Sequence, residues 1–163
     1  PYDYAKVTHL FPDSENFMVD FSIIPCQDNN GELQIELQNE ESSPAVRISF
    51  DPDGMIRTKT HYKYEDIMPY KSGLIYDIMI EVKGFDQEVL INVNGNKISN
   101  QFFAPMRSFS QIVFRTGGVN RSLNPDTPAR QAFDLKNADI MEKEASFFLL
   151  KLKSRRGANS DKD

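Results

Sequence analysis

Alternation of apolar and polar residues constrains the fold of this chain more than any other feature. It runs through seven segments, and turn-forming residues separate most of them. The segments are 17–23, 33–37, 46–50, 78–82, 89–93, 112–114 and 148–152. Because successive side chains of a strand point to opposite faces, this pattern predicts β-sheets with one apolar and one polar face.

Turn residues between these segments indicate that the strands run antiparallel. Asn29-Asn30-Gly31, Asp51-Pro52-Asp53-Gly54 and Asn94-Gly95 combine residues that tolerate positive φ with a proline that presets the first turn position. Three further segments, 5–11, 55–60 and 97–103, bring the expected total to about ten strands. Short and regular spacing of this kind favours an all-β, antiparallel two-sheet sandwich.

The ends and the one irregular region set the expected domain limits. We expect 5–11 to be an edge strand ended by Pro12-Asp13, and 1–154 to form a single domain. Residues 155–163 are polar and charged, which predicts a flexible tail. Only 134–143 suggests a short helix, within or beside a long connection over 116–139. Such a long connection is typical of a functional excursion.

Composition excludes two classes of partner. The formal net charge of −5 argues against nucleic acid, whose binders usually carry a basic face. No run approaches the roughly 20 apolar residues that a membrane span needs, so we expect no membrane partner. The chain opens on Pro1 with no initiator Met and no signal segment, which suggests a piece of a longer protein.

Several local motifs resemble the concanavalin A-like lectin/glucanase superfamily, which includes laminin-G-like modules. They are 17–24 followed by 31–37, 46–50 with its Asp53-Gly54 turn, and 76–82 leading to 89–95. Ile112-Val113-Phe114-Arg115-Thr116-Gly117 also resembles a stretch of modules appended to bacterial polysaccharide-degrading enzymes. The resemblance spans roughly residues 4–153 and implies a jelly-roll fold. It leaves open whether the chain is a glucanase, a lyase or a non-catalytic module.

No catalytic constellation of that superfamily is recognisable. Its glucanases carry Glu, Asp and Glu at alternate positions of one strand, so that a close pair acts as nucleophile and general acid. Here Glu32, Gln34 and Glu36 take those positions, and the required Asp is missing. We therefore interpret them as a solvated strand face. His9 and His61 have no recognisable nucleophile, and no alginate-lyase motif is present. We expect no catalytic residue.

Tyrosines are the best candidates for contact with a sugar. Sugar-binding sites use flat aromatic faces flanked by fixed hydrogen-bond donors. Tyr62 and Tyr64 would point the same way in an extended segment, and Tyr70 follows closely. The plainer interpretation, which we weigh more heavily, is that these tyrosines cap the core at the rim of the sandwich. The absence of Trp counts mildly against a flat polysaccharide-binding surface.

Arginines near the long connection suggest a second set of ligand-binding candidates. Arg115 and Arg121 would pair bidentately with the carboxylates or sulfates of an acidic polysaccharide. Alternatively, Arg115 closes an internal ion pair with Asp134 or Asp139, and we prefer this second interpretation.

Calcium is common in the superfamily, which makes the oxygen-rich loops candidate metal sites. The candidates are Asp28-Asn29-Asn30, Asp51-Pro52-Asp53, and Asp134 with Asp139, and none has a diagnostic spacing. We expect no cofactor and no metal ligand, with calcium as the open alternative.

Together these observations predict a non-catalytic carbohydrate-binding or accessory module of a secreted bacterial polysaccharide-degrading enzyme. The expected partners are a polysaccharide or oligosaccharide and a neighbouring catalytic domain, in an extracellular or periplasmic location. The alternatives are a jelly-roll glycoside hydrolase or polysaccharide lyase, and a purely structural domain.

Overall fold

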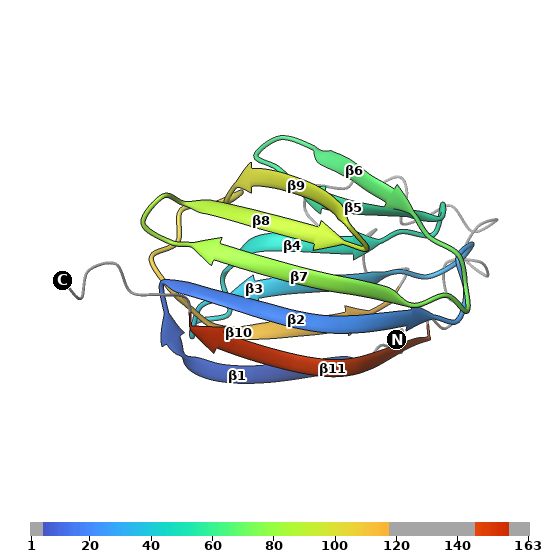
Figure 1. The fold of residues 1–163 in the computed structure, drawn as a ribbon, viewed down its shortest axis with the longest axis horizontal. Coiled ribbons are helices and arrows are strands. Elements are labelled where there is room, and N and C mark those ends of the chain that lie inside the picture. Colours follow the sequence, from blue (N-terminus) through green and yellow to red (C-terminus); the bar gives the residue numbers. More distant parts are fainter. Residues whose placement is uncertain (1–4, 118–145, 157–163) are drawn as a thin grey trace, which may run out of the picture.

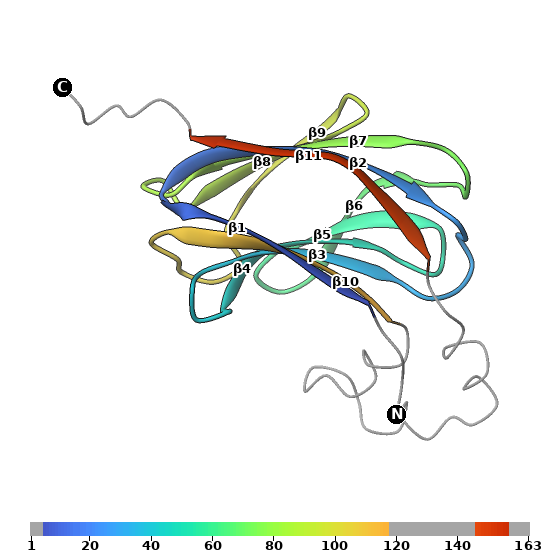
Figure 2. The same cartoon turned by 90° about the horizontal axis from the view of Figure 1, so that it is seen from below.

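The computed structural model describes residues 5–117 and 146–156, which form eleven β-strands and no helix. The strands are β1 (Lys6–Ser14), β2 (Asn16–Pro25), β3 (Leu33–Gln38), β4 (Pro44–Phe50), β5 (Met55–Lys59), β6 (Tyr64–Pro69), β7 (Tyr76–Lys83), β8 (Glu88–Val93), β9 (Asn96–Gln101), β10 (Phe109–Thr116) and β11 (Phe147–Arg156). They build two sheets that lie face to face (Figures 1 and 2).

Each sheet is antiparallel throughout. The six-stranded sheet has the order β1-β10-β3-β4-β5-β6, and the five-stranded sheet has the order β11-β2-β7-β8-β9. Strands distant in the sequence are therefore neighbours, since β1 pairs with β10 and β2 pairs with both β7 and β11. The predicted two-sheet sandwich of jelly-roll type is confirmed.

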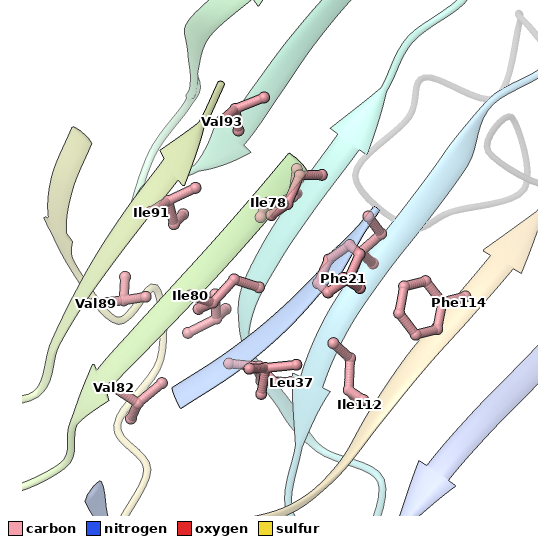
Figure 3. Packing of buried hydrophobic residues seen from close by; sticks show 14 of the residues in the cluster. Phe21, Leu37, Ile78, Ile80, Val82, Val89, Ile91, Val93, Ile112 and Phe114 are labelled. Atoms are coloured by element: carbon pink, nitrogen blue, oxygen red, sulfur yellow. The ribbon is translucent and has the colours of Figure 1, made fainter. Parts of the chain in front are cut away.

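The core lies between the sheets and is built from the apolar half of the alternating pattern. In β4, Val46, Ile48 and Phe50 are buried in this core, while Arg47 on the alternate face keeps some exposure. Figure 3 shows how Phe21 and Ile80 of one sheet face Leu37 and Ile112 of the other. Burial of this apolar surface is the main favourable term in folding, so the alternation fixes which face of each sheet is left for function.

Most expected strands are present, with differences at three places. β1 is an edge strand as expected, but it continues through Pro12 to Ser14, because an edge strand tolerates a proline. The expected tail begins too early, since Arg155 and Arg156 belong to β11. β6 was not predicted. The suggested helix 134–143 and most of the connection 116–139 lie outside the described residues.

Candidate functional site

A charged pair lies on the outer face of the six-stranded sheet. Glu36 of β3 and Arg47 of β4 are directly opposite each other in the register, and both side chains point away from the core. The Arg47 Nε atom donates a hydrogen bond to Glu36 Oε2 at 2.5 Å, and Gln38 Nε2 donates to Glu36 Oε1 at 2.9 Å. The two charged side chains keep only 13% and 7% exposure. This pair is therefore held rigidly, with most water excluded.

Aromatic rings surround the Arg47 guanidinium and a neighbouring ammonium. Arg47 Nη1 donates to the Tyr64 hydroxyl at 3.0 Å, and its Cζ atom lies 5.2 Å from the centre of the Phe103 ring. The Lys59 Nζ atom lies 5.3 Å from the Tyr64 ring centre and 5.5 Å from that of Phe103. All three of these cation-to-ring distances suit cation–π attraction. We call Glu36, Arg47, Lys59, Tyr64 and Phe103 the aromatic–cation cluster.

Four neighbouring strands, β3 to β6, and the connection between β9 and β10 bring this cluster together. Lys59 of β5 and Tyr64 of β6 are partners in the register across a short turn. Phe103 belongs to the connection between β9 and β10, and its N–H donates to the Ala45 carbonyl at 2.9 Å. Burial alone would lower the pKa of Arg47, but the Glu36 carboxylate and the Tyr64 hydroxyl outweigh it and raise that pKa. The cluster is thus a fixed, charged surface with two ring faces.

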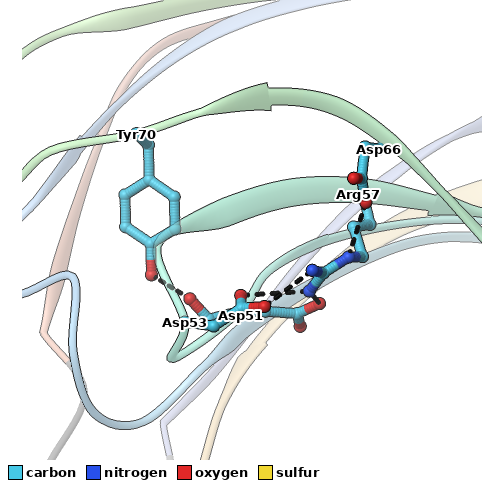
Figure 4. A network of polar contacts seen from close by, with 5 residues as sticks. All are labelled: Asp51, Asp53, Arg57, Asp66 and Tyr70. Atoms are coloured by element: carbon cyan, nitrogen blue, oxygen red, sulfur yellow. Dashed lines mark hydrogen bonds and ion pairs between the residues drawn. The ribbon is translucent and has the colours of Figure 1, made fainter.

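A second charged network surrounds Arg57 on the same face (Figure 4). The guanidinium binds Asp51 at 2.7 Å, Asp53 at 2.6 Å and Asp66 at 2.8 Å. Hydrogen bonding to Arg57 lowers the pKa of Asp53, and the bond to Asp53 is the largest cause of a raised pKa for Arg57. Because its donors meet three carboxylates, Arg57 organises the β4–β5 turn more than it offers a cation to a ligand.

The five residues predicted to bind a ligand occupy very different places. Tyr64 lies in the aromatic–cation cluster, and Tyr62 is 97% exposed in the turn before it. Tyr70 is instead in the core at 2% exposure, where its hydroxyl donates to the Asp51 carbonyl at 2.6 Å, so its ring faces no solvent. Arg115 is on β10, and Arg121 lies outside the described residues.

Arg115 and Tyr64 share a face but not a site. Strands β3, β4 and β5 separate their strands, which corresponds to roughly 19 Å at the usual spacing. Arg115 Nη2 donates to Gln34 Oε1 at 2.9 Å, whereas Asp134 and Asp139, its expected ion-pair partners, lie outside the described residues.

The interpretation of Glu36 as part of a solvated strand face is wrong. Glu36 is 5% exposed and Glu32 is 4% exposed. The oxygens of Glu36 are engaged by Arg47 and Gln38. Sequence reasoning missed Arg47, Lys59 and Phe103 as site residues. Arg47 and Lys59 are visible as cations in two strand segments, but nothing in the sequence indicated that the distant Phe103 lies over both of them.

The calcium candidates that the structure describes have protein partners. Asp51 and Asp53 bind Arg57, and Asp28 Oδ2 accepts a hydrogen bond from the Ser72 N–H at 3.0 Å. In the described ranges, no three His, Cys, Asp or Glu side chains are grouped so as to hold a metal ion. Nor does this part of the chain contain a helix long and apolar enough to span a membrane.

The two packed antiparallel sheets define a jelly-roll sandwich with a lectin-like fold. The chain resembles the chicken liver agglutinin CG-16 (TM-score 0.55, 12% identity, covering 93% of this chain and 100% of that one). It also resembles a polysaccharide lyase of family 18 (TM-score 0.55, 11% identity, covering 89% and 74%). At these identities the likeness concerns the fold alone.

A family model identifies the chain more closely. The model described as the sialidase-like CBM domain matches residues 1–131, and the chain belongs to this family of carbohydrate-binding modules. A solved sialidase is 32% identical with a TM-score of 0.79, and the match covers all of this chain. The chain spans 15% of the length of that sialidase. Among curated proteins, none matches. The chain is a carbohydrate-binding module, as the sequence predicted.

Proposed function

We propose that the module binds acidic glycans, sialylated chains in particular, at the aromatic–cation cluster. The observation that carries this proposal is the placement of two cations and two aromatic rings on one partly covered face. The name of the 32% identical relative, a sialidase, supports sialic acid as the acidic sugar. A sugar of this kind combines a carboxylate with an apolar ring face, and the cluster offers a partner for each.

The cations of the cluster differ in what they leave for a ligand. Arg47 uses Nε on Glu36 and Nη1 on Tyr64, and no described residue accepts from its Nη2. Lys59 forms no ion pair with any described carboxylate, and its ammonium lies over the Tyr64 and Phe103 rings. A sugar carboxylate near Lys59 and Arg47 Nη2 would gain charge-assisted hydrogen bonds without breaking the Glu36–Arg47 pair.

Exposed aromatic surface extends the cluster at one end of the sheet. Tyr62 lies two residues before Tyr64 and is almost fully exposed. A half-buried Tyr64 ring and an exposed Tyr62 ring suit stacking against successive sugar units, since aromatic rings bury apolar area at little entropic cost. We assign Tyr62 to the sugar next to the acidic one.

We further propose that the module is part of a longer bacterial enzyme that acts outside the cytoplasm, in the extracellular space or periplasm. A sialidase of which the matching region makes up 15% supports a neighbouring catalytic domain. The module would hold that domain near its substrate. We also propose that binding needs no cofactor, because all donors in the cluster are side chains.

Calorimetry with 3′-sialyllactose and with lactose tests the binding proposal. We expect the sialylated sugar to bind more tightly, and Lys59→Met to weaken it about tenfold by removing one charged hydrogen bond. Tyr62→Ala should also weaken it. Lys63→Met, an exposed lysine in the same turn, is the matched control and should leave affinity unchanged.

Equal affinity for both sugars, or full affinity in Lys59→Met, would contradict the proposal. Absence of binding to any glycan would instead favour a purely structural module. Measurements after dialysis against EDTA and after adding calcium test the cofactor statement, since a gain with calcium would overturn it.

A further inference from the structure

A groove of about 510 Å³ crosses the outer face of the five-stranded sheet, on the opposite side of the sandwich from the aromatic–cation cluster. Strands β2, β7, β8 and β11 line it. Met79 lies between Asp20 and Asn92 in the register, so a half-buried apolar side chain has polar neighbours on both sides. Nothing in the proposed function uses this groove.

The acceptors of the groove are held in place. Asp77 Oδ1 accepts a hydrogen bond from the Ser22 hydroxyl at 2.5 Å, and its backbone N–H donates to Asn94 Oδ1 at 2.7 Å. Asn92 Oδ1 accepts from the Gly95 N–H at 2.8 Å, which fixes its amide. No described residue accepts from the Asn92 Nδ2 group. The amide is therefore a preformed donor beside Met79.

Asp20 and the two lysines of the groove form no short ion pair with one another. Asp20 lies opposite Lys153 in the register, and Lys151 also lines the groove, yet no ion pair within 4 Å links Asp20 to either lysine. A bulge in β11 between Leu150 and Lys153 accompanies this geometry, with Lys151 at a φ of 54°. A left-handed φ is unfavourable for lysine, and the bulge redirects the strand at the groove wall.

The chemistry of the lining selects one class of ligand. Asp20 and Asp77 are balanced by Lys151 and Lys153, so the groove has no net charge to attract an ion. Carboxylates accept from hydroxyls, while ammonium and amide groups donate to them. Methionine supplies a polarizable apolar floor. Polar walls around an apolar floor suit a pyranose ring, which has hydroxyls at its edge and C–H groups on its face.

We propose that this groove is a second carbohydrate-binding site, which takes a neutral hexopyranose over Met79 with its hydroxyls on Asp20, Asp77 and Asn92. This site goes beyond the proposed function, because it lies on the other sheet and takes a sugar without a carboxylate.

The test is an NMR titration of the ¹⁵N-labelled protein with methyl α-D-galactopyranoside, methyl α-D-mannopyranoside and methyl β-D-glucopyranoside. At least one of these should shift the amides of Asp77, Asn92 and Gly95. Asp20→Ala should weaken that binding about tenfold, since it removes a charge-assisted acceptor. Asp20 has no hydrogen bond or ion pair to a described side chain, so this variant should fold normally.

Two control variants test whether the sugar binds in the groove and not elsewhere on the module. Glu81→Ala removes a carboxylate from the same face of β7 outside the groove and should leave binding unchanged. Lys59→Met, on the other face, should also leave binding of the neutral glycoside unchanged. Loss of binding in the groove can therefore be distinguished from loss of binding at the aromatic–cation cluster. The proposal is overturned if none of the three glycosides shifts the groove amides, if Asp20→Ala binds as the wild type does, or if 3′-sialyllactose shifts those amides and the neutral glycosides do not.

Discussion

At the scale of single residues, neighbouring tyrosines of similar sequence context have opposite roles. Tyr64 shares the outer face with Arg47, whereas Tyr70 turns inward and packs at 5.0 Å from the Phe50 ring centre. Burial, followed by the negative charge of Asp51, raises the pKa of the Tyr70 hydroxyl, which must stay protonated to donate to the Asp51 carbonyl. Tyr70 thus anchors the turn that carries the Arg57 network (Figure 4).

The Arg57 network predicts a pH-dependent contribution to stability. The pKa of Asp53 is lowered in the folded state, so its stabilising effect is present above the unfolded value of about 4 and is lost as the pH falls through the lower folded value. Arg57→Met should destabilise the fold at pH 7 by removing the cation shared by three carboxylates. The free-energy difference from wild type should shrink between pH 5 and pH 3. Urea unfolding across this range measures it.

A matched arginine separates this effect from a general loss of charge. Arg107 is 90% exposed, and its ion pair with Glu15 spans 3.8 Å, so solvent screens it. Arg107→Met should therefore change stability little at any pH. A constant difference between Arg57→Met and wild type from pH 7 to pH 3 would contradict the role given to Arg57.

At the scale of elements, a close approach of backbones fixes one end of the sandwich. Gly84 follows β7, and its N–H donates to the Glu15 carbonyl at 2.9 Å. A Cβ atom added at Gly84 would lie 2.7 Å from that same carbonyl oxygen, which is backbone and cannot rotate away. The link between the β1–β2 and β7–β8 turns therefore depends on a residue without a side chain.

Gly84→Ala should cost about 1–3 kcal/mol, because the two turns must separate to admit the methyl group. Chemical denaturation of wild type and variant gives this value. Phe85→Ala is the neighbouring control: Phe85 is 91% exposed, and the change should stay within about 0.5 kcal/mol. Equal stability of Gly84→Ala and wild type would show that the turns can move apart at no cost.

The sequence predicted the strands better than the surfaces they carry. Segments such as 46–50 and 78–82 alternate strictly, and the core selects their register without ambiguity. β6 was missed because Glu65 and Asp66 interrupt its alternation at the sheet edge. The outer cluster was missed because it depends on a cross-strand pair, Glu36 with Arg47, and on Phe103 from a distant connection. No local pattern encodes such contacts.

At the scale of the whole molecule, the two sheets pack face to face (Figure 2), and each proposed site lies on the outer face of a different sheet. The core between the sheets separates them, so a glycan bound on one face cannot block the other. A single copy of the module would then connect two glycan chains. Two weak sites on one rigid body hold a surface bearing many glycans more strongly than either site alone, through effective concentration.

This arrangement predicts that a monomeric module crosslinks beads coated with a sialylated glycoprotein that also carries neutral hexoses. Turbidity should rise with the wild type and rise far less with Lys59→Met or Asp20→Ala, since each variant weakens one of the two sites about tenfold. The two variants mixed together should also give little turbidity, because neither molecule has two sites of full affinity. Size-exclusion chromatography excludes crosslinking by dimers. Clustering at the wild-type level in either single variant would place both contacts on one face and contradict a two-faced module.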